Sequence, residues 1–433
     1  MRISASNEPC HSWDNGNRGL RKAIREVLSR GRASGATGVG PQRFGHCVPL
    51  RAGAANKRRA RQPVQNRACV RTWTDPKAVT TWLDAELSTL TAVAVQAPTA
   101  DRPAVAVQLS GILFRYLDET GRHTDALIIH RNARYAAAGL ADTIGEARAL
   151  HGLGASLWQQ GDYDLATSHT HQALTLFREA GDQVGTARTL GNLGIIELRQ
   201  GRYGPAIELN TRALALYQQA GDVRGQIPPL LGVGAAEGWL GRHDAAIEHL
   251  SQALALAYAH EASSVPYALA TLGDVETARG RYERAVEHLQ QALALFRQFG
   301  NRTGEAWSLD SLGTVHTRLG QYGAAARYHA EALALFRRIG DRDGEPWALN
   351  GLGEAVAGDE QPTEALSWHT AAVRAATALG NLHQQARAHA GLATAHRGLG
   401  AASQAEEYDS RALDLFTELG TPEAVQIRTR RER

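Results

Sequence analysis

The stretch GDYDLATSHTHQALTLFREAGD, from Gly161 to Asp182, is similar to the stretch GRYGPAIELNTRALALYQQAGD, which runs from Gly201 to Asp222, forty residues further along the chain. Both begin with a glycine, a polar residue and a tyrosine, and both end with Gly-Asp. Glycine ends a helix readily because it adopts the left-handed conformation, and aspartate suits the turn that follows. The pattern predicts a unit of about forty residues that consists of helix, tight turn and helix.

The opening turn recurs through the chain, and alanines follow it at fixed distances. The turn starts at Gly121, Gly161, Gly201, Gly241, Gly280 and Gly320, and in degenerate form at Glu360 and Gly400. Five residues later stand Ala126, Ala166, Ala206, Ala246, Ala285, Ala325, Ala365 and Ala405, and seven residues after these stand Ala133, Ala173, Ala213, Ala253, Ala292, Ala332, Ala372 and Ala412. Seven residues span about two helical turns, so both alanines share one stripe of the second helix and let a neighbouring helix approach closely.

The first helix of each unit carries a glycine seven residues before the turn. These glycines are Gly154, Gly194, Gly234, Gly273, Gly313 and Gly353. A glycine inside a helix is about 1 kcal/mol less favourable than alanine. We expect close packing against the following helix to offset that loss.

The spacing of glycine and the two alanines resembles the tetratricopeptide repeat over about 315 residues. Tyr163, Tyr203, Tyr282 and Tyr322 match the family's aromatic position, whereas its proline at the end of the second helix is missing. The resemblance implies an all-α fold, a right-handed α-solenoid of about eight 40-residue hairpins. It also implies a concave groove, lined by the first helices, that binds a peptide or a partner helix.

A shorter resemblance lies upstream of the repeats. Trp82-Leu83-Asp84-Ala85-Glu86 opens an Ala- and Leu-rich stretch. It looks like the linker before the C-terminal repeats of the antibiotic regulatory protein family and related NB-ARC transcriptional regulators of bacteria. The DNA-binding and NTPase modules of those regulators are not visible here, so their activities do not transfer to this chain.

Charge divides the 433 residues into two parts. Residues 1–73 contain fifteen basic and three acidic residues, and the remaining residues have a net charge of −9. We expect residues 1–72 to be a disordered Arg-rich segment, 74–106 a helical linker or cap, 107–420 the repeat array and 421–433 a capping helix or tail. The basic segment is interpreted as a solvated tail, as the product of a start codon assigned too far upstream, or as a weak contact to nucleic acid.

The groove is the predicted functional site, because the other face of each first helix packs against its partner. The residues expected there are Arg148, His151, Trp158, Arg188, Asn192, Ile195, Leu198, Leu231, Trp239, Tyr267, Trp307, Asp310, Trp347, Asn350 and Glu354. Asn192 is singled out because an amide at that position can hold a ligand's backbone. Units three and four should present an apolar floor.

Enzyme motifs are missing. The sequence has no GxSxG or HExxH motif, and lysine does not occur beyond Lys77, which excludes a Walker phosphate loop there. The recurring histidines of the second helices lack acidic or cysteine partners at ligand spacing, so we expect neither metal nor cofactor. The three cysteines, all within the basic segment, show no disulfide pattern, and no apolar run could span a membrane.

Two hypotheses of different class remain. The first is a cytoplasmic, non-enzymatic interaction module with a protein or peptide partner, serving as the sensor or regulatory arm of a bacterial signalling or transcription system. The second is a DNA-associated regulator that uses residues 1–70, or a remnant of a longer NB-ARC regulator. Self-association is left open.

Overall fold

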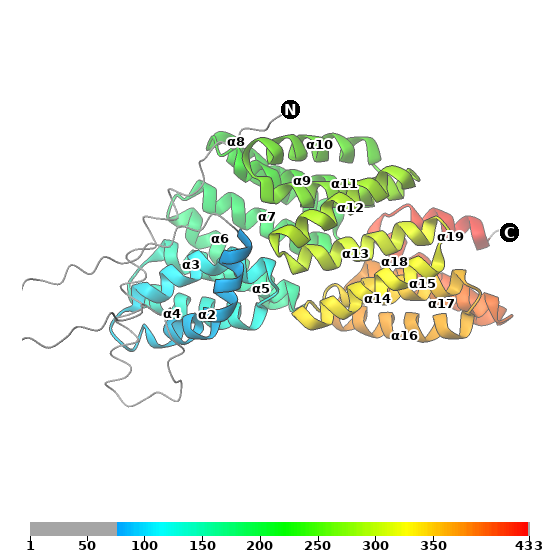
Figure 1. The fold of residues 1–433 in the computed structure, drawn as a ribbon. Helices are drawn as coiled ribbons and strands as arrows, with labels where there is room; N and C mark the ends of the chain where they lie inside the picture. Colours follow the sequence, from blue (N-terminus) through cyan, green and yellow to red (C-terminus); the bar gives the residue numbers. More distant parts are fainter. Residues whose placement is uncertain (1–75, 432–433) are drawn as a thin grey trace, which may run out of the picture.

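The computed structural model describes residues 76–431, and every regular element within that range is helical (Figure 1). A single helix precedes eight helical hairpins, and a short helix follows them. The predicted all-α solenoid is confirmed for this part of the chain. The basic segment 1–72, its expected disorder and its contact to nucleic acid lie outside the described residues.

Each hairpin pairs an odd-numbered first helix with an even-numbered second helix. The helices are α2 (Pro76–Gln96), α3 (Pro103–Glu119), α4 (His123–Gly139), α5 (Thr143–Gln159), α6 (Tyr163–Glu179), α7 (Gln183–Arg199), α8 (Tyr203–Gln219), α9 (Ile227–Trp239), α10 (His243–His260), α11 (Val265–Ala278), α12 (Tyr282–Phe299), α13 (Arg302–Arg318), α14 (Tyr322–Ile339), α15 (Glu345–Gly358), α16 (Pro362–Leu379), α17 (Leu382–Gly398), α18 (Ala402–Leu419) and α19 (Glu423–Arg431). Short 3-10 turns, η1 (Arg224–Gln226) and η2 (Ala262–Ser264), precede α9 and α11.

Local sequence explains where most first helices begin. The side-chain oxygen of Asp182 accepts a hydrogen bond from the Gly185 amide at 2.8 Å, and Asn301 caps α13 in the same way. The cap satisfies an amide that has no partner inside the helix. The Gly-Asp and Gly-Asn pairs therefore end one unit and start the next, as the sequence predicts.

The alanine stripes form the core of the array. All sixteen alanines at the two recurring positions are at most 3% exposed, as the packing argument requires. The glycines of the first helices lie against the second helix of the same unit, as expected. A Cβ on Gly313, for example, would stand 2.6 Å from the ring of the fully buried His329.

We predict that Gly313→Ala destabilises the protein although alanine favours helix. The added methyl group forces His329 to shift within a packed core, which we expect to lower the free energy of unfolding by about 1–3 kcal/mol. Gly323→Ala in α14 is the matched control, because nothing lies within 4 Å of its Cβ position, and it should stabilise by up to about 1 kcal/mol. Urea unfolding followed by circular dichroism measures both. Equal changes in the two variants would contradict the packing explanation.

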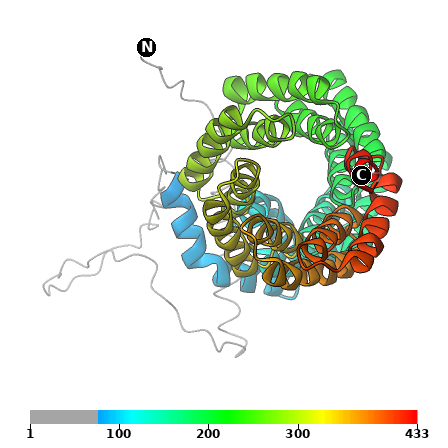
Figure 2. The ribbon, with the colours of Figure 1, turned by 90° about the vertical axis from the view of Figure 1, so that its right-hand side faces the viewer.

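The hairpins wind into a superhelix that encircles an axis (Figure 2). Neighbouring first helices such as α7 and α9 contact one another, whereas neighbouring second helices lie further apart. The first helices therefore line the inner side of the curve. We call the sides of α3, α5, α7, α9, α11, α13, α15 and α17 that face the axis the inner face.

The units that contain α13 to α18 form a second turn of the superhelix, and this second turn packs on the first turn, which the preceding units form. The turn glycines Gly121, Gly161 and Gly201 each lie against the last apolar residue of a second helix five units further along the chain. These partners are Ile339, Leu379 and Leu419. A backbone bond joins the turns as well, since the Arg342 amide donates to the Gln159 carbonyl at 3.1 Å. We call this line of contact the seam.

Two helices cover the ends of the array. Leu83, Leu87 and Leu90 of α2 are buried in a cluster with residues of α3 and α4. At the other end, Ile427 of α19 packs with Phe416, and Arg430 pairs with the buried Asp409. These helices fall within the segments 74–106 and 421–433 that the sequence suggests as caps.

Candidate functional site

An apolar strip runs across the inner face in the third and fourth units. Ile195 and Leu198 of α7 and Leu231 of α9 are only half-buried, although each contacts the core. Gly191 and Ala235 on the same helices add little bulk and are also half-buried. Solvent therefore reaches a stretch of mainly apolar surface here, in the place where the sequence predicts an apolar floor.

A belt of tryptophans crosses the seam beside this strip. The ring of Trp239, at the end of α9, lies 5.4 Å from that of Trp347 on α15, and Trp347 lies 5.7 Å from Trp307 on α13. His383 of α17 approaches Trp239 at 4.6 Å. The three tryptophans, which we call the tryptophan belt, are half-buried. Residues from three predicted groove positions thus meet because the second turn lies against the first.

Arg199 links the two turns. Its guanidinium lies 4.1 Å from the ring centre of Trp307 and 5.6 Å from that of Trp158. Its Nε also lies 3.6 Å from Oδ2 of Asp343, a carboxylate with no exposed surface. The Tyr163 hydroxyl donates to the other oxygen of Asp343. A cation that faces two aromatic rings and a buried carboxylate fixes the geometry of the seam.

Two buried carboxylates share this one arginine. Burial and the neighbouring Asp343 charge raise the pKa of Asp341 to about 7, against the opposing effect of Arg199. Burial also raises the pKa of Asp343, while Arg199 and the Tyr163 hydroxyl lower it. Burial and the closeness of the two carboxylates therefore disfavour the ionisation of both acids beside a single cation.

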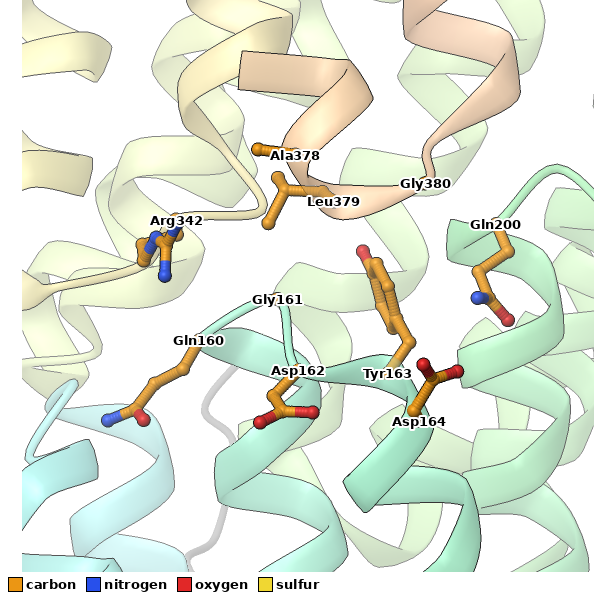
Figure 3. Close-up of a pocket in the computed structure, with 10 residues that line it drawn as sticks. All are labelled: Gln160, Gly161, Asp162, Tyr163, Asp164, Gln200, Arg342, Ala378, Leu379 and Gly380. Carbon is orange, nitrogen blue, oxygen red and sulfur yellow. The ribbon is translucent and has the colours of Figure 1, made fainter. Parts of the chain in front are cut away.

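A cavity of about 390 Å³ opens on the seam next to this group (Figure 3). Gln160, Asp162 and Gln200 line it from the first turn, and Arg342 and Leu379 line it from the second. Tyr163 points from the first turn toward the second in the same view. The cavity is mostly polar and follows from the way the two turns meet.

Two residues predicted to line the groove, Asp310 and Asn350, instead form hydrogen bonds to neighbouring helices. Asp310 lies 2.7 Å from Nδ1 of His329, and Asn350 donates to the backbone and side-chain oxygens of Gln384 at 3.0 Å. Both are almost fully buried. The small glycines nearby bring the helices so close that these side chains meet a buried partner instead of facing the axis. The expectation that they face the open groove is corrected.

The remaining predicted residues differ in how far they are exposed. Arg148 and Arg188 are exposed, His151, Trp158 and Asn192 are buried, and Tyr267 and Glu354 are half-buried. Arg387 donates two hydrogen bonds, of 2.6 and 2.9 Å, to the Glu354 carboxylate. This contact lowers the pKa of Glu354 to about 2, although burial alone would raise it. Asn301 donates to the Tyr267 hydroxyl. Glu354 and Tyr267 therefore have partners already.

Sequence reasoning missed Arg199, Tyr163, Asp341, Asp343 and His383. One signal was present: Thr303, Asp343 and His383 each stand three residues after the glycine that ends the preceding second helix, and all three contact the first turn. Their variation in residue type gives no hint of a shared contact. Only the superhelical winding brings them to the seam.

Residues 76–431 show neither a metal site nor a membrane span. Within that range, no group of three or more histidines, cysteines or acids is placed to hold a metal ion. Nor does any helix there have the length and apolar character needed to cross a bilayer.

Comparison with solved structures identifies similar superhelices. A Rap protein complexed with competence and sporulation factor is 16% identical and has a TM-score of 0.56, with 78% of this chain and 99% of that chain covered. The Rap conjugation gene regulator of plasmid pLS20, in complex with the Phr* peptide, is 14% identical, with a TM-score of 0.55 and coverage of 78% and 96%. Aspartyl phosphate phosphatase F from Bacillus subtilis is 12% identical, with a TM-score of 0.51 and coverage of 82% and 97%. At this level of identity the likeness is one of fold.

Sequence comparison is consistent with the repeat analysis. No curated protein matches the chain. A family model described as tetratricopeptide repeat matches residues 145–219, 227–298, 264–338 and 344–418, which together are more than half of the chain. These matches coincide with the helical hairpins from α5 to α18. The chain therefore belongs to the tetratricopeptide repeat family.

Proposed function

We propose that this protein binds an extended peptide segment on its inner face. The observation that carries the proposal is the half-buried apolar strip of Ile195, Leu198 and Leu231, with the tryptophan belt beside it. Apolar side chains of a peptide would displace water from the strip, at about 25 cal/mol for each Å² buried. Curved helical arrays use their concave side in this way.

Two further features support a peptide. Nδ2 of Asn192 is buried on the inner helix α7 and has no hydrogen-bond partner, so a small side-chain rotation would let it donate to a peptide carbonyl. Two of the similar folds are described in complex with a peptide or with competence and sporulation factor. In this proposal the protein acts as a regulatory arm, in line with its resemblance to the repeat region of antibiotic regulatory protein and NB-ARC regulators.

The proposal is tested with a pool of N-acetylated random octapeptides and the immobilised full chain. We expect Ile195→Gln to lower the retained peptide at least tenfold, because a polar amide in the strip removes its apolar contact. Retained peptide is quantified by mass spectrometry.

The matched control is Ile128→Gln, which changes an exposed isoleucine on the second helix α4. It should retain peptide as the unchanged protein does. Circular dichroism confirms that both variants remain helical. Equal retention by the two variants would refute binding on the inner face.

A further inference from the structure

The seam is a narrow interface, and its one cation with a buried partner lies inside it. Most packing in the array is between helices that are neighbours in sequence. Contacts between the two turns come mainly from linkers and from helix ends, as in the contact of Gly161 with Leu379. Arg199, at the end of α7, and Asp343, in the linker before α15, belong to this interface. A change of charge there acts on few contacts, and two rigid bodies can part at such an interface while each stays folded.

Three acids depend on the Arg199 guanidinium, and we call these four residues the seam cluster. Asp341 and Asp343 stand in the linker before α15, and Asp274 lies on α11. Arg199 attracts the charged form of each acid. Burial and the charge of Asp310 raise the pKa of Asp274 to about 7, although solvent reaches its side chain. Full ionisation of the three acids would leave an excess of negative charge around one cation in surroundings of low polarity.

The other charged side chains beside the linker add more negative than positive charge. Arg342 belongs to the same linker, but its side chain is exposed and lines the cavity. On the first turn, Asp162 and Asp164 line the same cavity and are also exposed (Figure 3). Burial raises the pKa of Tyr163 above its ordinary value, so its hydroxyl remains a neutral donor. Arg199 is therefore the cation on which the buried acids depend.

Protons relieve the excess of negative charge in a defined pH range. Burial and the charge of Asp343 raise the pKa of Asp341 to about 7, and burial also raises the pKa of Asp343. Their ordinary value is 3.8, so the closed seam favours the protonated acids. This contribution to the closed seam is complete below about pH 4 and is lost as the pH rises to about 7. Mildly alkaline solution therefore weakens the interface.

The tryptophan belt contains residues from both turns. Trp239 belongs to α9 of the first turn, whereas Trp307 and Trp347 belong to α13 and α15 of the second. The Arg199 guanidinium contacts Trp307 as well as Asp343, so one side chain joins the seam cluster to the belt. Separation of the two turns would move Trp307 and Trp347 away from the apolar strip, which lies on α7 and α9.

We infer that the seam opens when the seam cluster ionises, and that this opening splits the tryptophan belt and lowers the capture of a peptide. The effect on the peptide rests on the proposed function, whereas the opening of the seam does not. The closed form, which holds the belt together, is favoured in mildly acidic solution. The open form is favoured in mildly alkaline solution.

Small-angle X-ray scattering of the full chain at pH 5.5 and pH 8 tests the opening without any peptide. We expect the radius of gyration to be larger at pH 8 by on the order of a tenth. Circular dichroism should show the same helix content at both pH values, because the hairpins stay folded while the turns separate.

Asp341→Asn should keep the smaller radius at pH 8, because it removes one buried charge and leaves Asp343 with Arg199 and Tyr163. Asp182→Asn is the matched control, since Asp182 caps α7 by the same bond and does not belong to the seam cluster. It should expand at pH 8 as the unchanged protein does.

A pool of N-acetylated octapeptide amides without ionisable side chains tests the effect on the peptide. We expect the unchanged protein to retain at least tenfold more of this pool at pH 5.5 than at pH 8. Asp341→Asn should retain equal amounts at both. His383 is a titratable side chain next to the belt, and its nearest carboxylate is that of Glu423 at 3.9 Å. Titration of His383 does not explain this pattern, because Asp341→Asn leaves His383 in place.

The possible outcomes separate the inference from the proposed function. A radius that is the same at both pH values, or one that changes equally in Asp341→Asn and in the unchanged protein, would overturn the inference. Equal retention of peptide at both pH values by the unchanged protein would also overturn it. If the radius is constant and Ile195→Gln still abolishes retention, the proposed function stands and the inference fails. If the radius changes as expected but no peptide is retained at either pH, the opening stands and the proposed function fails.

Discussion

Replacement of Arg199 by methionine is expected to loosen the seam and to lower the free energy of unfolding by about 3–5 kcal/mol. Methionine keeps an apolar contact with Trp307 but leaves Asp343, which has no exposed surface, without its cation. An uncompensated buried charge costs far more than the lost contact itself. Urea unfolding measures the loss, and small-angle X-ray scattering should give a larger radius of gyration as the two turns separate.

A control for this prediction is Arg212→Met in α8. Arg212 pairs with Glu208 at 3.7 Å on the exposed side of the helix. Exposed pairs of this kind contribute at most about 1 kcal/mol, and the radius of gyration should not change. An Arg199→Met protein with the stability and scattering of this control would show that the seam does not depend on the arginine.

Asp341→Asn is expected to stabilise the protein by about 1–3 kcal/mol at pH 8. Asparagine removes a buried negative charge that lies next to Asp343 and keeps the cap, since Asp341 accepts from the Gly344 amide at 3.1 Å. Asn301 and Asn381 already make this bond at the equivalent positions of the neighbouring units, at 2.8 and 3.0 Å.

The gain should depend on pH in a defined direction. The folded-state pKa of Asp341, about 7, lies above its ordinary value of 3.8, so folding favours the protonated acid. Its stabilising contribution is complete below about pH 4 and is lost as the pH rises to about 7. The advantage of Asp341→Asn should therefore be largest at pH 8 and shrink toward pH 4.

Urea unfolding at pH 8, 6 and 5 measures this dependence. Asp182→Asn is the control, because Asp182 caps α7 in the same way without a second carboxylate two residues away in the linker. Its effect should vary little across the series. If the free energies of unfolding of Asp341→Asn and Asp182→Asn changed with pH in the same way, the explanation from two neighbouring buried carboxylates would be contradicted.

The hairpins could be predicted from sequence because they depend on local spacing. Ala166 and Ala173 lie on one stripe of a helix whatever its surroundings, and both are fully buried. Gly154 likewise lies against Thr170 of its own unit. Contacts between residues a few tens of positions apart follow directly from the helix period and the turn.

The site was only partly predictable because it depends on the winding of the whole array. Trp239 and Trp347 were expected on the groove as separate residues, but their contact depends on the small rotations of several units added together. Asp310 was expected on the groove as well, yet its partner His329 lies on the second helix of the same unit. Helical position alone does not separate an inward side chain from one held between two helices.

The five-unit offset between partners across the seam also restricts how such a gene can change in length. Open solenoids tolerate gain or loss of a module, because each module meets only its sequence neighbours. Here Gly161 must meet Leu379 and Gly201 must meet Leu419. Deletion or duplication of a single unit between them would shift every later residue away from its contact in the first turn. The tertiary structure therefore restricts the number of units that the chain can have.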